Sequence, residues 1–180
     1  MFTANSGTHV VCCCDDCQAF AHYLDRDDVV LDEYGGTALF QMPISHLKIT
    51  EGAEKIRCVR LSSKGIFRWY TACCKTPIGN TLSAGWPFIG LIHNFIKDPD
   101  QRENYFGPVL GYTQTKFAKK ALPSGLNKAA FFVRIIMRSL SKFILWKLKG
   151  LNRPSAFFDS SGKPVSVPHI LNSKTNSLKE

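Results

Sequence analysis

Apolar and polar positions alternate in several short segments of the first 92 residues, and this period of two is typical of half-buried β-strands. The predicted strands cover residues 9–11, 37–42, 47–50, 56–61 and 66–70, and residues 29–32 form a further strand or extended segment. Residues 62–65 separate the last two strands and predict a hairpin turn. Pro77 and Gly79 interrupt the pattern, and the apolar segment 86–92 fits a helix or a strand.

Two segments have apolar residues at the three- or four-residue spacing typical of a helix. Residues 18–24 place Phe20 and Leu24 four positions apart, and an acidic run ends this short helix. A long helix is predicted from Lys128 to Lys149, with Gly150 as its stop. Its apolar arc consists of Phe132, Ile135, Ile136, Leu140, Phe143 and Ile144. Its basic stripe consists of Arg134, Arg138 and Lys142.

The remaining segments complete a prediction of fold class and domain organisation. Residues 98–111 and the tail after Gly150 contain spaced prolines and are expected to be loop-like or extended. We therefore expect a mainly β protein of the α+β class with a C-terminal amphipathic helix. Residues 1–112 would form the β domain, and residues 113–180 would form a basic helical extension and tail packed on the same domain.

Composition supports a folded, intracellular chain. The 180 residues are 44% hydrophobic and 12% aromatic, which are values of a globular protein. The chain has no uncharged apolar run of about 18 residues, so no transmembrane segment is predicted. The first residues lack the basic and apolar regions of a signal peptide. We therefore expect a cytoplasmic protein with reduced cysteines.

Charge is concentrated in the last third of the chain. Residues 113–180 contain 13 Lys and Arg against two Asp and Glu, whereas residues 1–112 are slightly acidic. A basic helix of this kind is either a solvated face or a weak contact for an anionic surface. No nucleic-acid-binding motif is evident, and the phosphate-loop, dinucleotide, serine-hydrolase and zincin patterns are also missing from the sequence.

Four of the seven cysteines lie within residues 12–17. Cys12, Cys14 and Cys17 form a C-x-C-x-x-C pattern, in which a short turn directs three sulfurs at one tetrahedral cation. Cys73 and Cys74 lie far downstream, and either of them offers a fourth ligand. Because thiolates are the preferred ligands of zinc, we predict a Zn²⁺ site formed by these cysteines.

Two other interpretations of the cysteines remain open at this level. They could be buried structural thiols, or reactive thiols that act without metal. Three thiolates with an open fourth position would be typical of a catalytic zinc site, and four thiolates of a structural one. Cys58 is expected to be a core thiol and His22 an exposed helix residue. Arg68 is either a surface residue or an anion contact near the metal.

Together these motifs resemble the glutathione-dependent formaldehyde-activating enzyme family, which includes centromere protein V. The family's C-x-C-x-x-C knuckle is matched by Cys12, Cys14 and Cys17, and its C-x-x-C-G-T-P motif by residues 71–77. Further similar segments are residues 35–37, 68–70 and 87–91, and the resemblance extends to the prolines of the tail. It implies an Mss4-like fold of small antiparallel sheets around zinc.

The chain departs from the family pattern in two places. Thr71 stands where the second motif has its first cysteine, and Lys75 where it has glycine, so Cys73 would replace the missing thiol. No C-x-C-G hairpin precedes Cys12, although members use it as part of a structural zinc site. Either a preceding segment is missing, or one site remains, which would be the family's substrate-facing site.

The resemblance implies carbon–sulfur chemistry, in which a zinc-held thiol such as glutathione adds to an aldehyde. The expected function is that of a zinc-binding protein with carbon–sulfur lyase activity on an adduct such as S-hydroxymethylglutathione. No catalytic base or glutathione-binding residue is evident. The alternative is a zinc-stabilised, non-catalytic binding module that uses the basic helix, and a third hypothesis is a redox-sensing thiol cluster.

Overall fold

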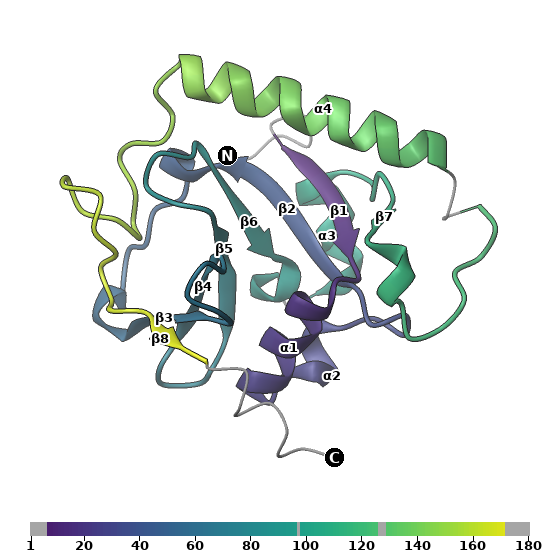
Figure 1. The fold of residues 1–180 in the computed structure, drawn as a ribbon, viewed down its shortest axis with the longest axis horizontal. Helices are drawn as coiled ribbons and strands as arrows, with labels where there is room; N and C mark the ends of the chain where they lie inside the picture. Colours follow the sequence, from purple (N-terminus) through teal and green to yellow (C-terminus); the bar gives the residue numbers. More distant parts are fainter. Residues whose placement is uncertain (1–6, 97, 126–128, 172–180) are drawn as a thin grey trace.

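The structure is a computed structural model that describes residues 7–96, 98–125 and 129–171 (Figure 1). One eight-stranded sheet runs through these residues in the order β7-β1-β2-β6-β5-β4-β3-β8. The strands are β1 (Thr8–Cys12), β2 (Thr37–Pro43), β3 (Ile56–Arg60), β4 (Phe67–Thr71), β5 (Pro77–Thr81), β6 (Phe88–Ile92), β7 (Tyr112–Thr113) and β8 (His169–Ile170). Neighbouring strands are antiparallel except at the two edges, where β7 and β8 run parallel to β1 and β3.

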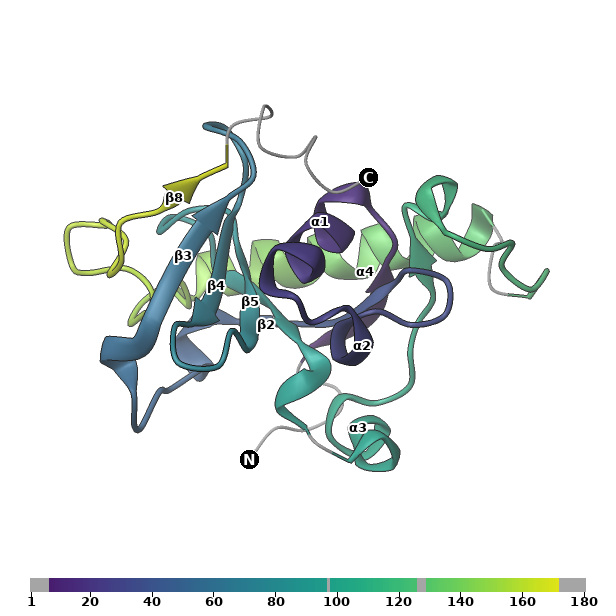
Figure 2. The same cartoon turned by 90° about the horizontal axis from the view of Figure 1, so that it is seen from below.

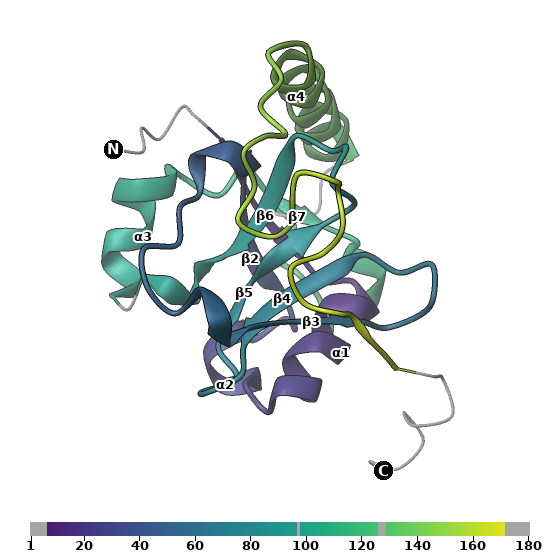
Figure 3. The same ribbon diagram turned by 90° about the vertical axis from the view of Figure 1, so that its left-hand side faces the viewer.

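Within the described part of the chain, four α-helices and several single-turn helices surround the sheet. The α-helices are α1 (Asp15–Leu24), α2 (Asp27–Val30), α3 (Pro99–Phe106) and α4 (Ala129–Leu148). Figure 3 shows α1 and α3 on opposite sides of the sheet. The predicted α+β class with mostly antiparallel strands is confirmed, although the strands form one continuous sheet instead of several small ones.

Most predicted strands are present, and the segment 86–92, which fitted a helix or a strand, contains the strand β6. Two expectations were wrong: residues 47–50 form no strand, and the expected loop 98–111 contains α3. The strand or extended segment expected at residues 29–32 is found only in part, because Val29 and Val30 end α2, whereas Leu31 is extended and forms an isolated bridge with Thr37. The interruption expected at Pro77 and Gly79 is also wrong, because both belong to β5. Pro77 is tolerated as the first residue of the strand. Gly79 is required because a Cβ there would lie 2.7 Å from the carbonyl oxygen of Gly90.

The core lies on both faces of the sheet. On one face, the fully buried Trp69 packs against Phe157 and Phe158 from the tail, and its indole N–H donates to Thr81 Oγ1 at 2.9 Å. On the other face, Phe20 and Leu24 of α1 pack against strand residues. The C-terminal region is therefore part of the same packed unit. It contributes β8 to one sheet edge (Figure 2), and β7 crosses the expected domain boundary at residue 112.

Helix α4 lies across the start of β1 and β6. Phe143 stacks on Phe88 with ring centroids 4.0 Å apart, and Ser139 Oγ donates to Gln41 Oε1 at 2.8 Å. The expected helix and its end near Gly150 are confirmed, although Lys128 and the side chain of Phe132 lie outside the described residues. Of the predicted apolar arc, Ile135 is buried against the sheet, whereas Ile136, Leu140 and Ile144 are exposed. None of the described helices is both long enough and apolar enough to span a membrane.

Candidate metal centre

The first cysteine turn connects the end of β1 to the start of α1. Cys12 ends the strand and Cys14 is the N-cap residue of the helix. Between them, the N–H of Cys13 donates to the carbonyl of Thr113 at 3.0 Å. Side chains alternate along an extended strand, so Cys13 points away from its neighbours, and it is fully buried. The C-x-C spacing therefore turns Cys12 and Cys14 towards a common side.

The side chain of Gln18 holds this turn in place. Its Nε2 donates to the carbonyl oxygens of Cys13 and Phe117, each at 2.9 Å. These two bonds join the cysteine turn to the segment that follows β7. Thr113 adds a bond from its Oγ1 to the carbonyl of Val11 at 3.2 Å. The turn is thus fixed by contacts on two sides before any ion binds.

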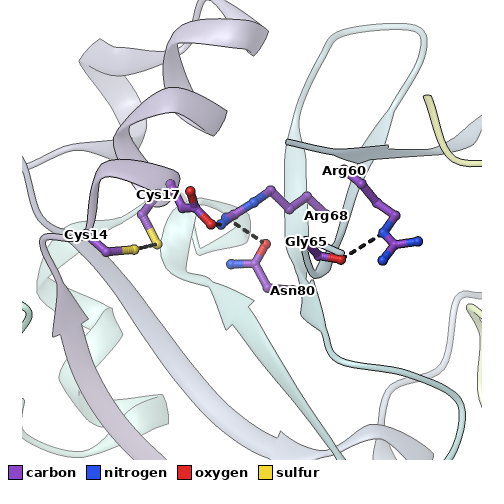
Figure 4. A network of polar contacts seen from close by, with 7 residues as sticks. Cys14, Cys17, Arg60, Gly65, Arg68 and Asn80 are labelled. Atoms are coloured by element: carbon purple, nitrogen blue, oxygen red, sulfur yellow. Dashed lines mark hydrogen bonds and ion pairs between the residues drawn. The ribbon is translucent and has the colours of Figure 1, made fainter. Parts of the chain in front are cut away.

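The three sulfurs of Cys12, Cys14 and Cys17 lie within 4.8 Å of one another. The sulfurs of Cys14 and Cys17 are 3.2 Å apart, and Figure 4 shows their side chains pointing towards each other. Tetrahedral zinc with bonds of about 2.3 Å places its sulfur ligands about 3.8 Å apart. The cluster therefore fits a metal ion of this size with small side-chain adjustments, and the predicted convergence of these three residues is found.

The electrostatics of the cluster favour one negative charge shared among three sulfurs. Hydrogen bonds from Cys14 and Cys17 hold the pKa of Cys12 far below its ordinary value. The bond to Cys12 raises the pKa of Cys14 to about 11, and bonds to Cys12 and then Cys14 raise that of Cys17 well above its ordinary value. A divalent cation would take the place of the two remaining protons, because thiolates are the ligating form.

Helix α1 also favours anionic sulfur at this place. Cys14 and Cys17 lie at its N-terminus, where unpaired backbone N–H groups and the helix dipole stabilise negative charge. Cys13, by contrast, is not part of the cluster. Burial raises the pKa of its thiol to about 12, so it stays protonated and unreactive.

The second cysteine pair does not join this group. Cys73 and Cys74 are exposed in the turn between β4 and β5, and the strand registers place this turn at the same end of the sheet as Cys12. Strands β6 and β2 lie between β5 and β1. Three strand spacings of about 4.8 Å each separate the two turns by roughly 14 Å. The expected fourth ligand from this pair is therefore not brought to the cluster.

Hydrogen bonds within the hairpin turn shape the chemistry of Cys74. Its sulfur lies 3.1 Å from Thr71 Oγ1, 3.0 Å from Thr76 Oγ1 and 3.6 Å from the sulfur of Cys73. The bonds to Thr71 and then Thr76 lower the pKa of Cys74 to about 7. This thiol is therefore exposed and about half ionised at neutral pH.

Arg68 is not the surface residue that one interpretation expected, because its side chain is 1% exposed. Its Nη2 lies 3.2 Å from Asp16 Oδ2, and its Nη1 donates to Asn80 Oδ1 at 3.5 Å (Figure 4). The guanidinium also lies over the ring of Phe20, 5.6 Å from its centroid. Arg68 thus ties the first turn of α1 to β4 and β5, beside Cys17.

Two smaller predictions about site residues are confirmed. Cys58 is buried in the core, and His22 is exposed and pairs with Asp27. The positioning roles of Gln18 and Thr113 were not predicted. Their partners lie about a hundred positions away along the chain, so no local sequence pattern could indicate them.

Together, the fold and site define a small α+β protein with a cysteine triad able to hold a metal ion. A comparison with protein-family models matches residues 3–168 to the family of unknown function DUF6151. Because the match covers most of the chain, the protein belongs to this family. No curated protein and no solved structure matches the chain.

Proposed function

We propose that the protein binds one zinc ion through Cys12, Cys14 and Cys17 and uses the open fourth position for a small thiol such as glutathione. The convergence of three sulfurs within 4.8 Å carries this proposal. Among the described residues, no other His, Cys, Asp or Glu joins the three. An all-thiolate set favours zinc, and three protein ligands with one open position are typical of catalytic zinc sites.

The proposed chemistry is carbon–sulfur bond formation or cleavage in a thiol–aldehyde adduct such as S-hydroxymethylglutathione. When bound, zinc would lower the pKa of a thiol in the open position so that it is deprotonated near neutral pH. In the forward direction, sulfur bonds to the aldehyde carbon, the carbonyl π electrons move to oxygen, and that oxygen takes a proton. The lyase direction breaks the same carbon–sulfur bond and returns the proton.

The chain's own residues would position and polarise this site. Gln18 fixes the turn from which the sulfurs project, and the N-terminus of α1 stabilises their negative charge. Asp16, held by Arg68, remains largely exposed beside the cluster and is a candidate acceptor for the amino group of a peptide-like thiol.

The resemblance to the formaldehyde-activating enzymes supports the same conclusion. The matching knuckle supplies the converging triad, and the predominantly antiparallel sheet is compatible with the Mss4-like fold that the resemblance implies. In that relationship, the hairpin with Cys73 and Cys74 corresponds to the second zinc motif of the family. Membership of that family and carbon–sulfur lyase activity are both part of the proposal.

An activity assay tests the proposal directly. Zinc-loaded protein is mixed with glutathione and formaldehyde, and adduct formation and breakdown are followed by NMR. We expect a rate above the uncatalysed reaction, lost in C14S and retained in the control C73S/C74S. A rate equal to the uncatalysed one in all proteins would contradict the enzymatic proposal.

Cobalt substitution separates metal and thiol binding from catalysis. With Co²⁺ in the site, we expect thiolate-to-metal absorption in the wild type that increases when glutathione is added. Absorption that does not respond to glutathione would contradict an open position for thiols. A response to glutathione without adduct turnover would favour a non-catalytic thiol-binding module.

A further inference from the structure

The outward face of α4 is apolar. Val133, Met137, Leu140, Ile144 and Leu148 are between 47% and 80% exposed. They recur every three or four residues, so they form one continuous stripe along the helix. The opposite side of the helix, with Ile135, Ser139 and Trp146, is buried against the sheet. The helix therefore presents bulky aliphatic side chains away from the core that holds it.

The stripe continues into a hollow beside the C-terminal half of α4. The hollow has a volume of about 490 Å³ and shares Leu140, Ile144 and Leu148 with the stripe. Its other lining residues are Ser83, Gly85, Trp86, Pro87, Phe143 and Lys147. Trp86 is 45% exposed at its rim. The apolar surface thus extends from the helix to the loop between β5 and β6 and includes an aromatic side chain suited to a membrane interface.

Basic side chains flank this apolar surface. Arg134 and Arg138 are exposed on one side of the stripe, and Lys147 on the other. Lys147 also donates to the carbonyl of Gly85, which holds the loop with Trp86 close to the helix. The sequence of α4 contains no acidic residue. Apolar residues at the centre of a helix face with cations at its margins are typical of helices that lie in the plane of an anionic membrane.

We propose that α4 and the loop carrying Trp86 dock on an anionic lipid bilayer, with the apolar stripe among the acyl chains and the basic residues at the headgroups. The shape of the surface favours lipid over other occupants. Nucleic-acid interfaces are polar and would leave the stripe unpaired. A second copy pairing through the same face would bring like charges together without acidic partners on either helix.

This inference does not depend on the proposed zinc chemistry. Lys142 of α4 donates to the carbonyl of Gly7, just before β1, whereas the cysteine triad begins at the far end of that strand. Five strand residues at about 3.3 Å each separate the two regions by roughly 16 Å. Docking through α4 would therefore leave the cysteine turn clear of the bilayer.

Vesicle binding by the full chain tests the proposal. Sedimentation is measured with phosphatidylcholine vesicles that contain or lack phosphatidylserine, at low and high salt. We expect the wild type to bind only the anionic vesicles and to dissociate as salt increases. Binding should also shift tryptophan emission to the blue, and W86F should lose most of this shift.

Paired variants distinguish the apolar and electrostatic contributions. M137E/I144E and R134E/R138E should each weaken vesicle binding by about 10-fold or more. The control K48E/K64E reverses two exposed charges away from α4 and should bind normally. Circular dichroism before sedimentation ensures that only folded variants are compared. If M137E/I144E does not fold, L140S, which is a milder change in the stripe, replaces it.

Three results would overturn the proposal. The first is equal binding to vesicles with and without phosphatidylserine, or no binding to either. The second is DNA binding that R134E/R138E abolishes and M137E/I144E leaves intact, without vesicle binding. The third is a dimer in light scattering that M137E/I144E dissociates, again without vesicle binding. This result would show that the surface binds a second copy of the chain.

Discussion

The two cysteine-rich turns both contain adjacent cysteines, but their structures differ. In the first, Cys12, Cys14 and Cys17 converge between a strand and a helix. In the second, Cys73 and Cys74 are exposed in a hairpin turn and bond to neighbouring threonines. The hairpin reverses the chain but contains no third cysteine, whereas the start of α1 brings the sulfur of Cys17 back to those of Cys12 and Cys14. A thiol cluster therefore needs both the third cysteine and a turn that returns it to the first two.

The support around each turn differs in the same way. Gln18 and the backbone of Thr113 hold the first turn from two sides. The side-chain hydrogen bonds of Cys74 with described residues lie within residues 71–76. We therefore expect the first turn to be a preorganised metal site and the second to be a reactive thiol that can be changed without affecting metal binding.

Removing one sulfur from the triad should have the largest effect. We expect C14S to lower zinc affinity by at least about 100-fold, because it leaves two thiolates of the ligand set. C73S/C74S removes both thiols from the hairpin and should bind zinc as the wild type does. Competition with a chromophoric chelator measures both. Equal losses in the two variants would show that the turns act together.

Zinc affinity should depend steeply on pH. The raised pKa values of Cys14 and Cys17 mean that both carry protons at neutral pH, and zinc must displace them. Affinity should therefore fall as pH falls, by about 100-fold per pH unit for two protons. Calorimetry in buffers of different ionisation enthalpy counts the protons released. If zinc binding releases no protons, then Cys14 and Cys17 are not protonated thiols in the metal-free protein, and this account of the cluster is contradicted.

Loosening the support of the first turn should have an intermediate effect. Q18L loses the bonds to the carbonyls of Cys13 and Phe117, so we expect zinc affinity to fall about 10-fold. The free energy of unfolding should fall by about 1–2 kcal/mol. Q101L, on the exposed side of α3, serves as control. Chelator competition and urea denaturation measure the two quantities, and unchanged affinity in Q18L would show that the turn needs no anchor.

The smallest expected effect concerns the reactivity of the hairpin. Because the pKa of Cys74 is lowered to about 7, its thiolate fraction rises as pH increases through that value. In a C73S background, the iodoacetamide rate at Cys74 should follow this rise, and T76V should move the midpoint to higher pH by removing a hydrogen bond. Mass spectrometry of the alkylated peptide measures the profile. A midpoint near the ordinary thiol pKa would contradict the role of the threonines.

The sequence predicted those features that depend on residues close together along the chain. A C-x-C-x-x-C pattern brings its sulfurs together through one turn, so the triad could be identified without the fold. The sequence could not show that Cys73 and Cys74 lie too far from the triad to supply a fourth ligand, because that distance depends on the two strands that lie between the turns. The sequence also did not show that Pro77 and Gly79 belong to β5, because this depends on the neighbouring strands as well. Gly79 is explained only by the approach of Gly90 from the next strand.

The orientation of α4 shows a second limit of sequence analysis. The helix is apolar on nearly every side, so its periodicity does not show which residues face the sheet. Phe143 and Ser139 make the contacts that fix its rotation, and their partners are in β6 and β2. The arc with Leu140 and Ile144 consequently faces outwards. Arg68 was equally ambiguous, because its burial depends on α1 crossing over β4.

X-ray absorption spectroscopy at the zinc edge tests the central claim most directly. On zinc-loaded wild-type protein, we predict three sulfur scatterers at about 2.3 Å and one lighter oxygen or nitrogen atom. Added glutathione should replace the lighter atom with a fourth sulfur. Four sulfur scatterers without glutathione, or a shell dominated by oxygen and nitrogen, would contradict a three-cysteine site with an open position.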